Sequence, residues 1–184
     1  GYWASQVWAT DGTLDGTNLI AERTDAGSYS QFYPNLNSSG YNLLGNNTVK
    51  KDENLYFYSN ATSANYQIMV SDGTAQNTRT ITDFDENNYT DMGKFASVGD
   101  KIIFTRTPRF YHYDKEIWSL DIETESAIKL GDSNFGFLGG AFDQVFINDR
   151  YIFVNNESEF DNELEIFSTD GTVEGTINLT EQYE

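Results

Sequence analysis

The sequence predicts an all-β protein built from copies of one small antiparallel sheet, and three observations support this fold class. Aromatic residues make up 15% of the 184 residues, and frequent Gly, Asn, Asp and Ser separate short apolar stretches, which favours strands joined by turns. A motif centred on an aspartate recurs four times along the chain. A second motif, a polar turn followed by alternating apolar residues, precedes the last three of those copies.

The aspartate motif sets the length of the repeat. Its copies read QVWATDGTLDGTNLI, QIMVSDGTAQNTRTI, EIWSLDIETESAIKL and EIFSTDGTVEGTINL, and their aspartates are Asp11, Asp72, Asp121 and Asp170. These aspartates are 61, 49 and 49 residues apart. A period of about 40 to 50 residues with strand-like content is typical of the blades of a β-propeller. The same pattern argues against a solenoid of helices.

Each copy of the aspartate motif is predicted to reverse the chain between two strands. Gly12, Gly73 and Gly171 follow the aspartate and can adopt a positive φ without steric cost. The third copy lacks this glycine but keeps Asp121 and Thr124, whose side-chain oxygens can bond loop amides. We therefore interpret all four aspartates as structural turn residues. One carboxylate per turn is too few for a Ca²⁺ site.

The second motif predicts a tight hairpin ahead of each later aspartate motif. Its copies are KKDENLYFYSN, SVGDKIIFTR and INDRYIFVNN. One unit then consists of two strands joined by a hairpin turn, a variable loop, a third strand, the aspartate turn and a fourth strand. Four antiparallel strands in about 50 residues are typical of a propeller blade. We expect a half blade at residues 1–20 and blades at about 41–82, 95–130 and 143–180.

The two motifs together resemble the ELWxxDGT repeat family of bacterial β-propeller-like modules. Residues 165–176, EIFSTDGTVEGT, match the pattern E-L-W-x-x-D-G-T-x-x-G-T by residue type, except for Phe167 at the tryptophan position. Trp8 and Trp118 keep that tryptophan, Met69 replaces it, and SVGDKIIF matches the hairpin element of the family. The resemblance covers almost the whole chain and implies a propeller-like fold in a secreted or cell-surface protein. It brings no catalytic motif.

The predicted units add up to about three and a half blades, whereas closed propellers usually have about four or more. We therefore expect the chain to be part of a larger propeller, because an open one would expose apolar faces and unpaired strand edges. The alternative is that partner chains complete a ring or a filament. The four residues at the tryptophan position are expected to pack blade against blade rather than to bind a ligand.

The charge of the chain argues against two classes of partner. Eleven Lys and Arg against 29 Asp and Glu give a net charge of −18, which repels the phosphates of nucleic acids and of anionic lipids. No stretch approaches the roughly 18 apolar residues of a membrane-spanning helix, so no membrane insertion is expected. The chain has no cysteine, which excludes disulfides and thiolate metal sites. The family resemblance implies an extracellular or cell-surface location.

One segment could bind Ca²⁺, although no cofactor is otherwise expected. The segment DFDENNYTD is similar to the front half of an EF-hand loop, and its candidate ligands are Asp83, Asp85, Asn87 and Asp91. However, Asn88 stands where the EF-hand has glycine, and Lys94 stands where it has a bidentate glutamate. These departures favour a solvated loop between two blades.

A second candidate site is the segment TRTPRFYHYDKE, residues 105–116, which gathers basic and aromatic side chains in an acidic chain. In the predicted blade it joins the second and third strands. Arg and Tyr side chains there could hold an acidic glycan or peptide by bidentate hydrogen bonds and stacking. The alternative is a loop whose aromatic residues pack on a neighbouring blade. The candidate residues are Arg106, Arg109, Phe110, Tyr111, His112 and Tyr113.

These features predict a non-enzymatic module that binds a glycan, a peptide or a protein through its loops. His112 is the only histidine, and no nucleophile or paired carboxylate motif accompanies it. The first alternative is a structural subunit of a bacterial surface appendage or matrix, which would associate with other copies of itself. The second is an extracellular hydrolase, because a pair of catalytic carboxylates could lie among the many acidic residues.

Overall fold

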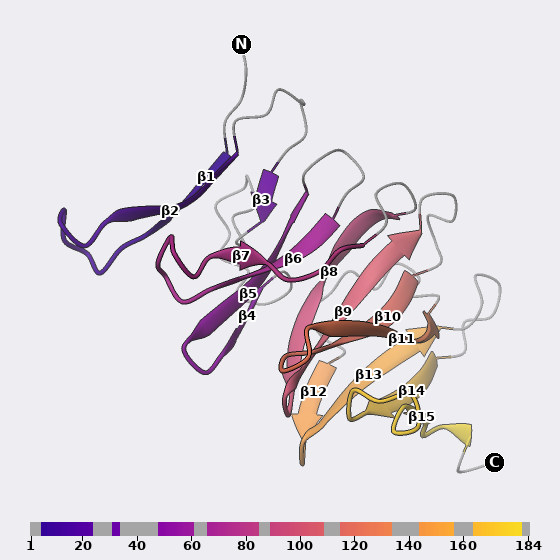
Figure 1. Ribbon diagram of the computed structural model, residues 1–184. Helices are drawn as coiled ribbons and strands as arrows, with labels where there is room; N and C mark the ends of the chain where they lie inside the picture. Colours follow the sequence, from indigo (N-terminus) through magenta and orange to yellow (C-terminus); the bar gives the residue numbers. More distant parts are fainter. Residues whose placement is uncertain are drawn as a thin grey trace. The chain divides into compact units, whose positions relative to one another are not determined.

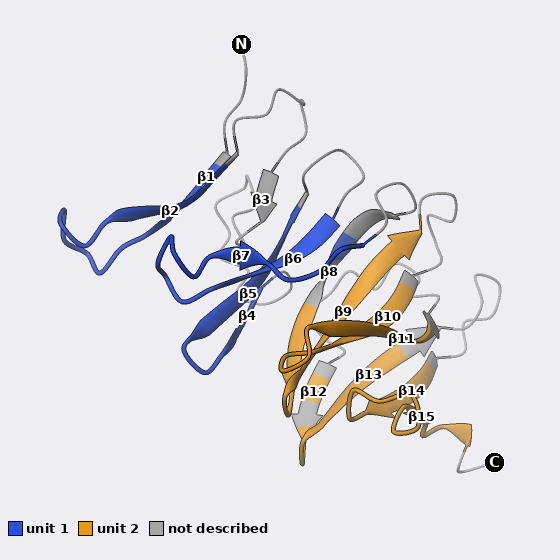
Figure 2. Cartoon of the chain, viewed as in Figure 1, with its two compact units in different colours: residues 1–93 blue, residues 94–184 orange. Residues whose placement is uncertain are grey.

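A computed structural model describes residues 5–23, 31–33, 48–60, 66–84, 89–108, 115–133, 144–156 and 164–181 (Figure 1). The regular elements in these ranges are β-strands, so the all-β prediction is confirmed. Within the same ranges, no helix has the length and apolar character needed to cross a membrane. The chain divides into two compact units, residues 1–93 and 94–184 (Figure 2).

The first two sheets are antiparallel and belong to the first unit. Sheet 1 is a hairpin of β1 (Ser5–Ala9) and β2 (Asn18–Arg23), and its register shifts between Val7 and Trp8. The strands of sheet 2 are β3 (Gln31–Tyr33), β4 (Thr48–Lys51), β5 (Asn54–Asn60), β6 (Tyr66–Ser71) and β7 (Arg79–Thr80). In sheet 2, β3 and β4 pair with successive parts of the same edge of β5, and β6 lies between β5 and β7. Sheet 2 is therefore four strands wide.

The last two sheets are four-stranded and follow the order of the chain. Sheet 3 contains β8 (Tyr89–Val98), β9 (Lys101–Pro108), β10 (Lys115–Asp121) and β11 (Ser126–Ser133). Sheet 4 contains β12 (Gln144–Ile147), β13 (Arg150–Asn156), β14 (Leu164–Thr169) and β15 (Ile177–Asn178). The pairings of β9 with β10, β10 with β11, β12 with β13, β13 with β14 and β14 with β15 are antiparallel. The prediction of four-stranded antiparallel sheets is thus confirmed for both.

The predicted hairpins form through turns of two residues. Lys51 pairs with Asn54 across the first turn, and Ile147 pairs with Arg150 across the last. Asn148 and Asp149 both have positive φ, 49° and 60°, which is the backbone of a type I′ turn. Such turns match the twist of the two flanking strands, and Asn and Asp tolerate positive φ better than other residues that carry a side chain.

The predicted blade boundaries remain predictions, but the strands show where they would need adjustment. Sheet 1 extends to Arg23, beyond the predicted end at residue 20. The strand β3 lies before the predicted start of the next blade at about residue 41, yet it pairs with β5 in sheet 2. No motif marks β3 in the sequence, because it has only three residues.

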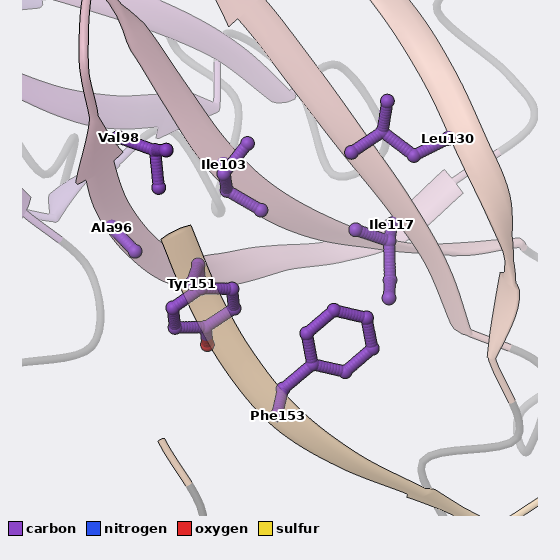
Figure 3. Close-up of a cluster of buried hydrophobic side chains, with 7 residues drawn as sticks. All are labelled: Ala96, Val98, Ile103, Ile117, Leu130, Tyr151 and Phe153. Atoms are coloured by element: carbon purple, nitrogen blue, oxygen red, sulfur yellow. The ribbon is translucent and has the colours of Figure 1, made fainter. Parts of the chain in front are cut away.

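The core of the second unit lies between sheet 3 and sheet 4. Sheet 3 contributes aliphatic side chains and sheet 4 contributes rings from β13, with Phe167 of β14 packed against the cluster. The rings of Phe153 and Phe167 are stacked, with their centroids 5.6 Å apart. Figure 3 shows the buried cluster, whose members are Ala96, Val98, Ile103, Ile117, Leu130, Tyr151 and Phe153. Alternation along each strand directs these side chains to one face of their sheet.

Candidate functional site

The recurring aspartate connects two strands of each sheet, and we call this connection the corner of the sheet. In sheets 1, 2 and 4, Oδ1 of the corner aspartate accepts two hydrogen bonds from the threonine two residues later. The backbone amide donates at 2.9 Å and the hydroxyl at 2.7 Å in all three corners. The aspartates are Asp11, Asp72 and Asp170. One carboxylate oxygen thus fixes the first half of each turn.

A pair of hydroxyls closes the same corner from the strand side. In sheet 4, the hydroxyls of Thr169 and Thr176 lie 2.7 Å apart, and the amide of Gly171 donates to Thr169. Because Thr176 donates its proton to the carbonyl of Thr172 at 2.6 Å, Thr169 must be the donor to Thr176. Equivalent hydroxyl pairs in sheets 1 and 2, also 2.7 Å apart, are Thr10 with Thr17 and Ser71 with Thr78.

The glycines of the corner serve two different purposes. Gly12, Gly73 and Gly171 have φ values of 93°, 91° and 85°, as the sequence predicts. Gly16 and Gly175 are instead needed for space, because a Cβ atom there would collide with the carboxylate of the corner aspartate. Sheet 2 has Asn77 at that position, and its Nδ2 donates to Oδ2 of Asp72 at 2.6 Å.

The corner of sheet 3 is shorter but keeps the central contact. Asp121 pairs with Ser126 across the turn, and the amide and hydroxyl of Thr124 both donate to Oδ1 of Asp121 at 2.9 Å. The positive φ lies at Glu125, at 54°, rather than directly after the aspartate. The predicted contact of Asp121 with Thr124 therefore forms although the backbone conformation of this corner differs from that of the others.

Hydrogen bonds lower the pKa of the four corner carboxylates. The threonine hydroxyl and amide lower the pKa of Asp11 and of Asp170, and the positive charge of Arg150 adds to this effect at Asp170. Asn77 is the largest cause of the lowered pKa of Asp72, whereas the amide of Thr124 is the largest at Asp121. A carboxylate held in this way is a weak proton acceptor, so its geometry suits a structural contact better than acid–base catalysis.

In sheets 3 and 4, a basic residue at the start of the second strand forms an ion pair with the corner aspartate. Lys101 Nζ lies 3.5 Å from Asp121 Oδ2, and Arg150 Nη1 lies 3.9 Å from Asp170 Oδ2. Arg150 also donates to the hydroxyl of Ser168 and to the carbonyl of Gly175. Both cations directly follow a two-residue hairpin turn, so they occupy the same place in the repeat.

A second repeated contact lies five residues before each corner aspartate. The residue there is Gln or Glu, and its side chain bonds the strand or segment that follows the corner. Glu116 receives a bond from Lys129 at 2.9 Å, and Glu165 receives one from Asn178 at 2.8 Å. Gln6 and Gln67 make the corresponding contacts, to Glu22 and to the segment at Thr82–Phe84. Sequence reasoning missed this contact, although aligning the four motifs places Gln or Glu at the position every time.

A cluster of charged side chains around a tryptophan in the described part of sheet 3 contains Arg106, Glu116, Trp118 and Lys129. The guanidinium carbon of Arg106 lies 4.9 Å from the centroid of the Trp118 ring, a cation–π contact. Trp118 Nε1 donates to Oε2 of Glu116 at 2.9 Å, and Lys129 holds the other carboxylate oxygen. Arg106 and Glu116 are buried and directly opposite each other on β9 and β10. The cluster therefore joins the second, third and fourth strands of sheet 3.

The structure describes one of the six candidate ligand-binding residues. Arg106 lies on β9, buried against Trp118, and is not an exposed loop residue. Its partners come from neighbouring strands, which a reading along the sequence does not reveal. The other five candidates, Arg109, Phe110, Tyr111, His112 and Tyr113, lie outside the described residues.

The candidate calcium loop is described only in part. Asp83 is exposed after β7, and Asp91 belongs to β8, although its side chain is outside the description. Asp85 and Asn87 lie outside the described residues. Where side chains are described, no three His, Asp or Glu residues lie close enough to hold a metal ion.

The four residues at the tryptophan position do not share one environment. Met69 is buried, Phe167 and Trp118 are half-buried, and Trp8 is exposed over 54% of its surface. The expectation that all four pack inside the protein is therefore wrong for Trp8. The sequence shows the position within the strand but does not show whether a neighbouring sheet covers it.

No family model matches the sequence, and neither does any curated protein. Among solved structures, the fold is similar to an oligogalacturonate lyase in complex with manganese, with a TM-score of 0.45 and 16% sequence identity. The match covers 87% of this chain and 37% of the lyase chain, so this chain spans well under half the length of that protein.

The comparison corrects one expectation from the sequence. The sequence predicts a non-enzymatic module that binds a glycan, a peptide or a protein, whereas the similar solved structure is a lyase, which is an enzyme. On this finding the prediction is wrong. At 16% identity and a TM-score of 0.45, the likeness transfers neither a reaction nor the manganese to this chain.

Proposed function

We propose that this chain is a repeat scaffold made of consecutive β-propeller blades of the ELWxxDGT type. The observation that carries the proposal is the corner, in which the same carboxylate and the same threonine make the same two hydrogen bonds in three sheets. The donors and acceptors of this contact belong to the turn itself, so the contact stabilises the connection between two strands. Because Oδ1 already accepts two hydrogen bonds, it has no capacity left for a ligand.

The packing of the second unit supports blades in particular. Propeller blades meet face to face, and equivalent apolar positions of successive blades form the interface. Sheet 4 packs its rings on the aliphatic side chains of sheet 3 in that manner. In this proposal sheets 2, 3 and 4 are complete blades, sheet 1 is half of one, and the whole belongs to a larger propeller. The resemblance to the repeat family supports an extracellular or cell-surface location for this protein.

An experimental structure tests the architecture. If the sheets are blades, rotations of similar size about one common axis relate sheet 2 to sheet 3 and sheet 3 to sheet 4. A two-layered sandwich, or sheets related by unrelated rotations, would contradict the proposal.

A metal titration tests the structural role of the corners. Backbone amide resonances of Thr13, Thr74 and Thr172 should not move when Ca²⁺ or Mn²⁺ is added, because the Oδ1 atom that accepts each amide already accepts two hydrogen bonds. Saturable shifts confined to these amides would instead make the corners metal sites. The amides of Asp52 and Glu53, in an exposed turn that also carries carboxylates, serve as the control for non-specific cation binding.

A further inference from the structure

The triplet Asp-Gly-Thr occurs four times in the chain, and three of its copies begin a corner. These three start at Asp11, Asp72 and Asp170, whereas the fourth starts at Asp15, inside the corner of sheet 1. Aspartate followed by glycine is the pair most prone to isomerisation, because glycine has no side chain that shields its amide nitrogen. Since all three residues are the same in each copy, the intrinsic reactivity of the four copies should be alike. Differences between them then depend on the folded structure.

Isomerisation begins when the amide nitrogen of the glycine attacks Cγ of the aspartate. A bond forms between nitrogen and Cγ, and the hydroxyl of the protonated carboxyl leaves with the amide proton as water. Water then opens the resulting five-membered succinimide at either carbonyl, and opening at the backbone carbonyl gives isoaspartate, in which the chain runs through Cβ and Cγ. The reaction needs no reagent other than water, but the carboxyl must be free to bring Cγ against the nitrogen.

The glycine amide is held in the same way in all four copies. It donates to a serine or threonine hydroxyl at 2.9 to 3.0 Å, and the donors are Gly12, Gly16, Gly73 and Gly171. Ring closure breaks this bond in every copy. The glycine amide therefore does not distinguish one copy from another.

In the three corner copies, the threonine of the triplet also holds the carboxylate. Its amide and its hydroxyl both donate to Oδ1 of Asp11, Asp72 or Asp170. The carboxyl would have to give up both bonds to reach the glycine nitrogen. Hydrogen bonds also lower the pKa of these three aspartates, with Asn77 as the largest cause at Asp72, so little of the protonated form that can lose water is present.

The fourth copy has the same residues but different contacts. The hydroxyl of Thr17 lies 2.7 Å from that of Thr10 and donates to the carbonyl of Thr13, so it does not bond Asp15. The amide of Thr17 donates to the carbonyl of Leu14. Asp15 is exposed, and its carboxylate makes no hydrogen bond or ion pair within the described part of the chain. Its carboxyl is therefore free to rotate toward the glycine nitrogen.

The position of Asp15 stays exposed where another sheet covers the corner. Glu174 is its equivalent in sheet 4, and it is exposed although Gly171 of the same corner is buried near Ser119 of sheet 3. Gln76 is exposed at the same position in sheet 2. The longer side chains of Glu and Gln would have to close six-membered rings, which form much more slowly. Of these three corners, only that of sheet 1 has a reactive side chain at this position.

We infer that Asp15 is a site of spontaneous modification, at which the folded protein forms isoaspartate while its corners protect the other three aspartates. Gly16 has no space to spare, because a Cβ there would collide with the carboxylate of Asp11. The longer backbone of isoaspartate should therefore displace Gly16 and open the corner of sheet 1. The inference goes beyond the proposed scaffold role and does not depend on whether the sheets are blades.

Ageing of the full chain in heavy-oxygen water provides the test, because each hydrolysed succinimide retains one heavy oxygen atom. The protein is kept for weeks in mildly acidic buffer and digested, and mass spectrometry with electron-transfer fragmentation quantifies isoaspartate at each site. Asp15 should react at least about tenfold faster than any corner aspartate, equivalent to about 1.4 kcal/mol of activation free energy, because its carboxylate has no hydrogen bonds to give up. In the chain aged in urea, the four sites should react at similar rates.

Two variants separate the reactive site from its protected counterparts. Asp15→Glu gives sheet 1 the residue type that sheet 4 has at this position, so it should abolish the reaction there and leave Asp72 and Asp170 unchanged. Thr172→Val removes one of the two donors to Asp170 and should raise isomerisation at Asp170 several-fold, with Asp72 as the control. Circular dichroism should show both variants folded.

Two outcomes would overturn the inference. If Asp15 isomerises no faster than the corner aspartates in the folded chain, its carboxylate is not free to react. If all four sites react as fast in the folded chain as in urea, the corners give no protection. Neither result bears on the metal titration, which tests the scaffold proposal separately.

Discussion

The corners of sheets 3 and 4 fasten equivalent strands with the same side chains but along different backbone paths. Sheet 4 passes from β14 to β15 through the seven residues 170–176 and places its positive φ at Gly171. Sheet 3 pairs Asp121 with Ser126, and its positive φ lies at Glu125, a residue with a side chain. Both corners keep the aspartate, the threonine and a cation from the second strand.

This difference shows which part of the motif is essential to the corner. The backbone conformation moves with the length of the turn, whereas the contact between carboxylate and threonine stays. That contact satisfies an amide that would otherwise lack an acceptor inside the turn, and this need does not depend on the path of the chain. Glycine directly after the aspartate is therefore required only in the longer turn, where that residue has a positive φ.

Gly171→Ala should have the largest effect, because it acts on the backbone path that only the glycine corners use. The new Cβ would occupy a positive φ and would also approach the side chains of Lys101 and Ser119 in sheet 3. We expect a loss of about 3 kcal/mol in the free energy of unfolding, from left-handed strain and from overpacking together. Urea unfolding of the two proteins measures it.

Gly12→Ala separates the two contributions to that loss. Gly12 has the same kind of φ, 93°, but a Cβ there meets nothing within 4 Å. Its replacement should cost about 1 kcal/mol, the strain alone. If both variants lost the same free energy of unfolding, the Cβ added at residue 171 would not be overpacked against sheet 3.

Asp170→Ala and Asp121→Ala remove the feature that the two corners share. Each variant leaves a threonine amide and hydroxyl without their carboxylate acceptor, so each should lose about 1 to 2 kcal/mol of unfolding free energy. Glu174→Ala, an acidic side chain in the corner of sheet 4 that is exposed, is the control for charge alone. If only Asp170→Ala were destabilising, the corner of sheet 3 would depend on its backbone rather than on Asp121.

The corners and hairpins could be predicted from the sequence because their causes are local. The carboxylate, its threonine and the glycine lie within three residues of each other, so spacing alone gives the contact and the sign of φ. The turn at Asn148 and Asp149 is equally local, since both residue types tolerate a positive φ and the flanking residues alternate in polarity. Four-stranded antiparallel sheets follow from counting these turns within one repeat.

The surroundings of Arg106 and Trp8 could not be predicted because they depend on other strands and sheets. Arg106 was expected in a loop, but register places it opposite Glu116 and near Trp118. Trp8 occupies the same motif position as Phe167, but Phe167 is half-buried against a neighbouring sheet and Trp8 is exposed. Periodicity gives the face of a strand but not what lies against that face.

Glu125→Gly should stabilise the protein, because it supplies glycine to the one corner that lacks it. Replacing a non-glycine residue at a φ of 54° by glycine removes strain and raises the free energy of unfolding by about 1 kcal/mol. Glycine also gives the unfolded chain more conformational entropy, which cancels part of this gain. We expect a net gain of about 0.5 kcal/mol. Glu123→Gly in the same turn has only the entropic cost and should destabilise slightly. The two variants should therefore shift the unfolding midpoint in opposite directions.

Acid should produce the smallest effect, and it distinguishes the charge of the corner from its shape. The hydroxyl and amide of Thr172, with Arg150, lower the pKa of Asp170 below its usual 3.8, so the folded state binds this proton less readily than the unfolded state. The resulting stability is fully present above about pH 5 and is lost as the pH falls through the lowered pKa.

Asp170→Asn removes this dependence on pH. At neutral pH the variant should be less stable than the parent protein by less than about 1 kcal/mol, because the carboxylate is so exposed. This difference in stability should shrink between about pH 4 and pH 2. Glu174→Gln, which removes one carboxylate charge from the same exposed corner, is the matched control for the change in net charge. A difference that stays constant down to pH 2 would mean that the corner depends on the shape of the carboxylate and not on its ionisation.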